Sequence, residues 1–278
     1  MRVLFLVPGG VEAQLHCLPA AAQVAEALGA QIQVACTPTA ATAWSLLPAV
    51  EKLIPFDFNS NPTLADWANL LGNVREPDFQ ACINLAAARQ VDLMLSMSHI
   101  PTRVAAGGFS ATNTVAMGSG WAAQAMASYL QPLGLTLNAD GFRLALPKPA
   151  LEKATSELPA GQGPALLLAP AGGTGDWPSS SWQELPDLVR SKLPDLRVVQ
   201  ANRNAKLLER AAQVSSCDVV LSSDPISTEL ALLCGMPLVA LGRTAADLPK
   251  RQGVQGIGAT GRLDQLQAAE VLQALGLG

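Results

Sequence analysis

The residue types best suited to proton transfer are scarce in this chain, which has only two histidines, His16 and His99. Glu12 and His16 follow Pro8-Gly9-Gly10, directly after the short apolar run 3–7. A carboxylate placed there is suited to act as a general base on a hydroxyl group. It is equally suited to offset the dipole at the start of a helix. Each histidine could act in catalysis or could simply pack against neighbouring residues.

A second glycine-bearing segment follows the apolar run 165–169 and contains Gly172, Gly173 and Thr174. Glycines after a buried strand let the backbone approach a phosphate or a ribose closely. The segment is not a P-loop, because the Gly-Lys-Ser/Thr ending is missing. It favours either a ligand-binding loop or a flexible connector.

The third segment of interest joins Ser222-Ser223 to Gly235. Small hydroxyl residues end a strand, and a helix is predicted to start near Ser227, with Glu229 close to its beginning. A helix N-terminus suits a diphosphate, and a nearby carboxylate suits ribose hydroxyls. An ordinary capped helix would have the same pattern. The residues predicted to contact such a nucleotide ligand are Gly172, Gly173, Thr174, Asp224, Ser227, Thr228, Glu229, Arg243 and Thr244.

Strand-like and helix-like blocks alternate along the chain and must position these residues. The first series has strands at 3–7, 31–36, 52–56, 79–85 and 102–106, with helices at 12–29, 37–50, 86–97 and 120–132. The second has strands at 165–169, 196–200, 219–222 and 238–241, with helices at 182–192, 204–214, 227–234 and 263–275. This alternation predicts an α/β fold of two Rossmann-like domains that face a cleft.

The boundary between the two series is predicted in 147–164, which is rich in proline, glycine and charge. We therefore expect domains at 1–150 and 151–278. A length of 278 residues agrees with two domains of roughly 150 residues each. The first domain would carry the glycine loop that contains Gly9 and Gly10, with His16 one turn into the helix that follows.

Composition excludes several classes of protein. Hydrophobic residues make up 49% of the chain and charged residues 14%, which excludes a disordered polymer. Eighteen basic residues stand against 22 acidic ones, with no basic tail, so nucleic acid is not an expected partner. The five cysteines lack metal-ligand spacing, and no apolar run reaches about 18 residues. We expect a cytoplasmic protein without a metal site, a signal peptide or a transmembrane helix.

Several stretches, in order, resemble the heptosyltransferase-like glycosyltransferases of family nine. They are MRVLFLVPGGVEAQLHCLPAAAQVAEAL, VEKLIPFDF, IPTRVAAGG, LLLAPAGG followed by SWQELPDLV, and DVVLSSDPISTELALLCGMPLVALGRT. The stretches FDFNSNPTLADWANLLGNVRE and LQPLGLTL are most similar to cyanobacterial members.

The resemblance implies a fold of the GT-B type. The first domain would bind the acceptor, with Gly9, Gly10 and His16 at the acceptor-side loop, and the second domain would bind a nucleotide-sugar donor through the donor-side residues given above. It implies inverting transfer to a glycan or lipid-linked acceptor, without a metal or other cofactor. A lipid-linked acceptor is compatible with peripheral contact at the inner face of a membrane. A protein partner is compatible with this picture.

Departures from the family pattern concern the residues that carry its chemistry. Ala13 stands where the family has its Asp base, so Glu12 would have to replace that base. Thr228-Glu229 stand where the family has Met-His, and no lysine occurs in 170–189. Two hypotheses follow. One is an active transferase that uses Glu12 as base and Glu229 on the donor ribose. The other is a catalytically inactive homologue that acts as a binding or assembly protein.

Overall fold

The computed structural model describes residues 1–277. They separate into two compact units, Met1–Gly141 and a second unit that begins at Phe142. The predicted division into two α/β domains is confirmed. The units divide earlier in the chain than the predicted boundary at 150/151. The segment 147–164, in which the boundary was predicted, contains helix α6 (Lys148–Ser156). This helix packs against α8 (Leu207–Ser215) and so belongs to the C-terminal domain.

The N-terminal domain is built on a six-stranded parallel sheet in the order β3-β2-β1-β4-β5-β6. This is the Rossmann order, and it places β1 at the centre of the sheet. Val3 to Val7 in β1 are buried, as expected for a strand covered on both faces. The strands are β1 (Arg2–Val7), β2 (Gln31–Cys36), β3 (Val50–Pro55), β4 (Ala81–Asn84), β5 (Thr102–Ala105) and β6 (Asn113–Thr114).

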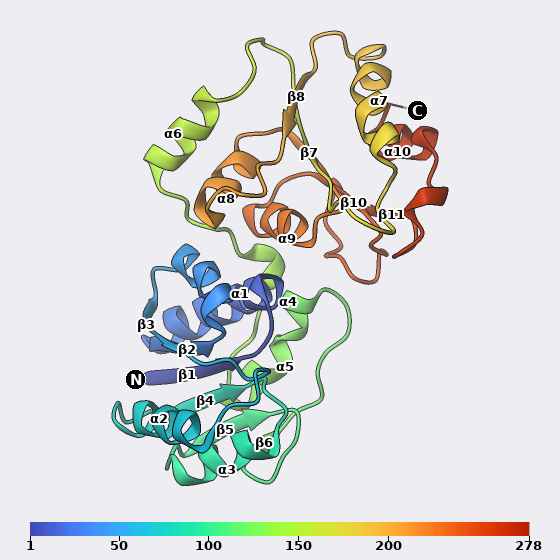
Figure 1. Ribbon diagram of the computed structural model, residues 1–278. Coiled ribbons are helices and arrows are strands. Elements are labelled where there is room, and N and C mark those ends of the chain that lie inside the picture. The colour runs from blue at the N-terminus through green and yellow to red at the C-terminus, as the bar shows by residue number, and fades with distance from the viewer. Residues whose placement is uncertain (278) are drawn as a thin grey trace. The chain divides into compact units, whose positions relative to one another are not determined.

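Helices cover both faces of this sheet, with α1 and α4 on one side and α2 and α3 on the other (Figure 1). Helix α1 ends at Gly29, which adopts the left-handed conformation with φ 55°. The helical segments are α1 (Val11–Leu28), η1 (Pro38–Leu46), α2 (Leu64–Arg75), α3 (Arg89–Met97), α4 (Ala122–Ala125), α5 (Ala127–Leu130), η2 (Gln131–Leu133) and η3 (Ala139–Gly141).

Some local predictions for this domain were wrong. The helix expected at 37–50 is a 3-10 segment, Pro38–Leu46, and the helix expected at 120–132 is divided into α4, α5 and η2. Helix α2 was not predicted, although it starts with a capping box in which Thr63 and Asp66 exchange hydrogen bonds. The Thr63-to-Asp66 spacing carries the signal that would have located it.

The C-terminal domain has a five-stranded parallel sheet in the order β11-β10-β9-β7-β8. Read from the other edge, this is the 2-1-3-4-5 order of flavodoxin-like sheets, with its switch point between β7 and β9. The strands are β7 (Ala165–Ala169), β8 (Arg197–Gln200), β9 (Val219–Ser222), β10 (Leu238–Leu241) and β11 (Val254–Ile257). The sequence did not predict β11.

Helices α6, α8 and α9 lie on one side of the second sheet, and α7 and α10 lie on the other (Figure 1). An apolar cluster that includes Leu168, Trp177, Trp182 and Leu221 fills the second side. The helical segments not yet given are α7 (Ser179–Arg190), α9 (Pro225–Cys234), η4 (Leu263–Gln265) and α10 (Ala268–Ala274). The helix predicted at 263–275 is thus a 3-10 turn followed by α10.

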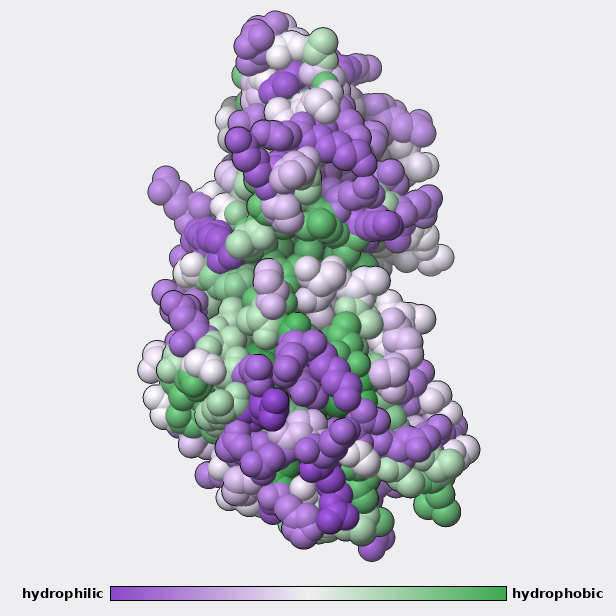
Figure 2. All heavy atoms as spheres, turned by 90° about the vertical axis from the view of Figure 1, so that its left-hand side faces the viewer, coloured by the Kyte–Doolittle hydropathy of each residue, from purple (hydrophilic) through white to green (hydrophobic). Residues whose placement is uncertain are grey.

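Hydrophilic residues predominate on the outer part of the C-terminal domain that Figure 2 shows. Exposed ion pairs contribute to the hydrophilic surface of this domain. One of them joins Lys153 of α6 to Glu209 of α8. Among the residues that the structure describes, no helix combines the length and apolar character needed to cross a bilayer.

Candidate functional site

The loop that leaves β7 in the C-terminal domain has a defined shape. Its Ala171 N–H donates to Ser223 Oγ at 2.8 Å, which joins it to the end of β9. Asp176 accepts from the Gly172 N–H through one carboxylate oxygen and from the Trp177 N–H through the other, each at 2.7 Å. Gly172 and Gly173 have φ of 69° and 97°, a region that favours glycine. The loop is therefore folded around Asp176 rather than an unstructured connector.

A cavity of about 770 Å³ opens beside this loop, between the start of α7 and the end of β8. Its volume lies within the usual range for small-molecule sites, roughly 300–1,000 Å³. Trp177 and Trp182 form an edge-to-face pair at its wall, with ring centroids 5.2 Å apart. Its polar lining includes Asp176, Ser179, Gln183 and Gln200. Gly172 and Gly173, two of the predicted donor-side residues, also line it.

Asp224 caps helix α9, accepting from the Ser227 N–H at 2.8 Å. The same carboxylate oxygen lies 2.6 Å from Nη2 of Arg210, which also donates to Ser227 Oγ at 3.0 Å. Thr228 donates to Ser222 Oγ at 3.0 Å. The four polar side chains Arg210, Asp224, Ser227 and Thr228 are buried. Three residues predicted to contact a donor therefore make structural contacts within their own domain.

Arg203 carries the accessible positive charge near this sheet edge. Its side chain is 52% exposed, and one guanidinium nitrogen lies 4.0 Å from Asp224 Oδ1. The other donates to the Ala171 carbonyl, and a Cβ at Gly172 would lie 3.3 Å from it. Arg203 therefore joins the loops after β7 and β9 and keeps part of its surface in solvent.

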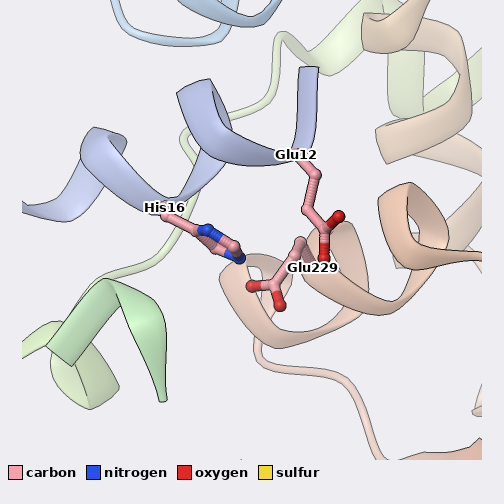
Figure 3. A group of neighbouring side chains, drawn as sticks. All are labelled: Glu12, His16 and Glu229. Carbon is pink, nitrogen blue, oxygen red and sulfur yellow. The ribbon is translucent and has the colours of Figure 1, made fainter. Parts of the chain in front are cut away.

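The other residues predicted to contact the donor lie on neighbouring elements of the C-terminal domain. Thr174 is exposed in the loop after β7. Arg243 and Thr244 follow β10, where Thr244 Oγ1 donates to Asp247 at 2.6 Å. Glu229 projects from α9 (Figure 3). Thr174 thus follows β7, Arg243 and Thr244 follow β10, and Glu229 lies on α9. The hydrogen bond to Asp247 makes Thr244 part of a local turn.

The acceptor-side loop of the N-terminal domain is held by Gln14, a buried residue that the sequence did not single out. Its side-chain NH₂ donates to the carbonyls of Val7, Pro8 and Gly9 at 3.1–3.4 Å. Its carbonyl oxygen accepts from Trp44 Nε1 at 2.8 Å. A lone amide in an Ala/Leu-rich helix is the signal that could have found it, because buried amides need partners.

Glu12 and His16 lie one turn apart on the same face of α1 (Figure 3). A carboxylate oxygen of Glu12 and a ring nitrogen of His16 are within 4.8 Å of each other. Ala13 faces Gly9 instead, since a Cβ on that glycine would lie 3.1 Å from the Ala13 methyl group. Ala13 therefore presents only a methyl group, which is packed on the loop.

The other candidate reactive side chains are His99 and the cysteines. His99 is exposed in the loop before β5. All five cysteines are free, and burial raises the pKa of Cys17 to about 12 and that of Cys36 to about 11. A thiol with such a pKa holds little of the nucleophilic thiolate near neutral pH.

Two parallel α/β domains of this kind define the GT-B glycosyltransferase fold. The chain is similar to the E. coli heptosyltransferase WaaC with a TM-score of 0.71, 18% identity and 99% of each chain covered. It is similar to a family 9 glycosyltransferase from Veillonella parvula with a TM-score of 0.78 and 14% identity, over 99% of this chain and 96% of the other. E. coli ADP-heptose LPS heptosyltransferase II gives 0.71 and 16%, over 99% and 98%.

No protein-family model and no curated protein sequence matches the chain. At these identities the likeness to solved structures establishes the fold. The heptosyltransferase-like fold expected from the sequence is thereby confirmed, while the closer similarity to cyanobacterial members stays a prediction.

Proposed function

We propose that the C-terminal domain binds a nucleoside diphosphate sugar and that the protein transfers the sugar, with inversion, to a glycan or lipid-linked acceptor. The observation that carries this proposal is the cavity beside the β7 loop, with the accessible guanidinium of Arg203 near the same sheet edge. Solved structures of the similar WaaC contain ADP in one case and ADP-2-deoxy-2-fluoro heptose in another.

The diphosphate of the donor gains negative charge as its bond to the sugar breaks. That charge has to be compensated by positive groups or hydrogen-bond donors of the protein. Arg203 supplies a planar guanidinium suited to phosphate, and the glycines after β7 expose backbone to a close ligand. Donors held in place before the reaction stabilise charge that develops during it. Glu229 is assigned to the ribose hydroxyls. No metal ion is part of this proposal.

On the acceptor side, Glu12 is assigned as the general base. It takes the proton of the acceptor hydroxyl while that oxygen bonds to the anomeric carbon and the nucleoside diphosphate leaves with the bonding electron pair. His16, one turn along α1, holds a ring nitrogen near the Glu12 carboxylate and positions it. A general base contributes roughly 10²–10⁴-fold to the rate of such a step.

A second function, that of a catalytically inactive homologue, is favoured by two observations. Ala13 packs its methyl group toward Gly9. The start of α9 is already occupied by the carboxylate of Asp224, which would repel a diphosphate at that helix end. Such a protein would bind a nucleotide or a partner without turnover.

Ligand-dependent melting of the full chain tests the binding step. ADP, GDP, UDP, CDP and their sugar conjugates are compared in the presence of EDTA. At least one should raise the melting temperature, since a ligand that binds only the folded state stabilises it. Arg203→Ala and Glu229→Ala should remove the shift, whereas Arg190→Ala, at the far end of α7, should keep it. No shift with any nucleotide would rule out both nucleotide binding and the transferase.

Turnover separates the two functions. Release of nucleotide from a stabilising nucleotide sugar, with acceptor added, supports the transferase, and Glu12→Gln should lower that rate by about 100-fold or more. Stabilisation without release supports the inactive homologue. We also propose a cytoplasmic location, since five free cysteines suit a reducing compartment.

A further inference from the structure

A separate cavity of about 410 Å³ lies in the N-terminal domain at the carboxyl ends of β4 and β5. This is the usual position for ligands in open α/β sheets. The loops 85–88 and 105–108 form most of its wall. The polar side chains that line it are Asn84, Arg89, Asp92 and Tyr129. None of these residues was assigned a role above.

Asn84 points to a ligand for this cavity. Its side chain is only 4% exposed, and its Oδ1 accepts from the Ala86 N–H at 2.9 Å, which fixes the orientation of the amide. The NH₂ group donates to no other residue in the described part of the chain. Asn84 lines the cavity, so its NH₂ group is available to donate to an acceptor atom of a molecule bound there.

Positive charge and backbone donors lie at the same wall. Helix α3 starts at Arg89 after Ala88, whose methyl group cannot cap it, whereas α2 and α9 begin with acceptor side chains. The N–H groups at the start of α3 therefore favour an anion. Within residues 1–277, the Arg89 guanidinium forms neither an ion pair nor a hydrogen bond.

Asp92 is the carboxylate that lines the cavity. Its Oδ1 accepts from Ser110 Oγ at 2.6 Å and from the Ser110 N–H at 3.4 Å. Gly108 lies against it with φ 100°, and a Cβ there would come within 2.5 Å of Asp92 Oδ2, so only glycine fits. Because Oδ1 is already occupied, Oδ2 is left to accept from a ligand hydroxyl.

We propose that this cavity binds a sugar that carries an anionic group, either a phosphate or a carboxylate. The anion lies between the Asn84 amide, the Arg89 guanidinium and the start of α3, and a hydroxyl of the same sugar donates to Asp92. Binding at this cavity is independent of the donor site.

Titration of the ¹⁵N-labelled full chain, followed by TROSY spectra, tests the site. Inorganic phosphate, glucose 6-phosphate and glucuronate are compared with uncharged glucose. We expect shifts in the backbone amides of Arg89 to Val91, Gly107 and Gly108 and in the side-chain NH₂ of Asn84. Tighter binding of glucose 6-phosphate or of glucuronate identifies the anion, and tighter binding than inorganic phosphate confirms the sugar contacts.

Two variants separate binding from folding. Asn84→Asp keeps an acceptor for the Ala86 N–H but removes the donor, so binding should be lost. Arg89→Ala, at an exposed position, should weaken binding about tenfold, in line with a hydrogen bond to a charged group. Arg75→Ala on α2 is the matched control and should bind as the native chain does.

Several outcomes would overturn the proposal. They are shifts absent from these amides, glucose binding as tightly as the charged sugars, or both variants binding with native affinity. Stabilisation by nucleotides is measured in the same variants and should be unchanged. If nucleotides fail and anionic sugars still bind, the proposed function falls while this site stands.

Discussion

Arg210 and Asp224 form a buried ion pair, with Nη2 of the guanidinium 2.6 Å from Oδ2 of the carboxylate. The same oxygen caps α9 through the Ser227 N–H. One side chain therefore neutralises a buried cation and starts the helix that follows β9. This dual use explains why Asp224 is tied to the framework of the candidate site.

Replacing Arg210 by Met should destabilise the C-terminal domain by about 3–5 kcal/mol, because Asp224 loses its buried partner and keeps only the longer 4.0 Å contact with the half-exposed Arg203. Urea unfolding followed by tryptophan fluorescence measures the loss. Arg190→Met is the control, since its exposed pair with Asp187 should contribute at most about 1 kcal/mol. Equal losses in the two variants would contradict a structural role for the buried pair.

Gln14→Leu should destabilise the N-terminal domain by about 1–3 kcal/mol, because Trp44 Nε1 and three loop carbonyls lose their partner. Gln90→Leu, at an exposed position of α3, should change stability by less than about 0.5 kcal/mol. Chemical denaturation provides the comparison. A loop that kept its stability without Gln14 would show that other contacts shape it.

The thiols should resist modification in the folded protein. Burial raises the pKa of Cys217 to about 12 and that of Cys234 to about 11, so little thiolate is present at pH 8. Ellman's reagent should therefore react slowly with the native chain and rapidly with all five cysteines in denaturant. Fast reaction of several thiols without denaturant would contradict their burial.

Asp66 should titrate below the usual range of an aspartate. The Thr63 hydroxyl and then the Thr63 N–H donate to its carboxylate, and both lower its pKa. A lowered folded-state pKa means that the stabilisation is present above the unfolded-state pKa and is lost as the pH falls through the folded-state pKa. Carboxyl-carbon NMR titration should show this shift, and Thr63→Val should move the pKa back up. An unchanged pKa in that variant would exclude the hydroxyl as the main cause.

The alternation of buried strands and helices predicted the fold well, because continuous apolar runs such as 3–7 and 165–169 are unlikely outside a parallel sheet. The predictions of single elements failed where the local residue pattern indicates one structure and packing against a neighbouring element favours another. Helix α6 lies in a segment rich in proline and charge, and one face of it is covered by α8. Short strands such as β11 lack a pattern of their own and depend on a neighbouring strand.

For the candidate site too, the sequence determined some features and the tertiary structure determined others. Residue types and their order along the chain determined two α/β domains and the glycine loops after β1 and β7. Only the tertiary structure decided which polar groups are occupied. Asp224 forms an ion pair with Arg210, which lies on the preceding helix α8. Arg203 remains accessible to solvent, and Asn84 lines a cavity. The reason is physical: residue order determines which side chains reach a sheet edge, but hydrogen-bond partners are chosen among residues that meet only after folding.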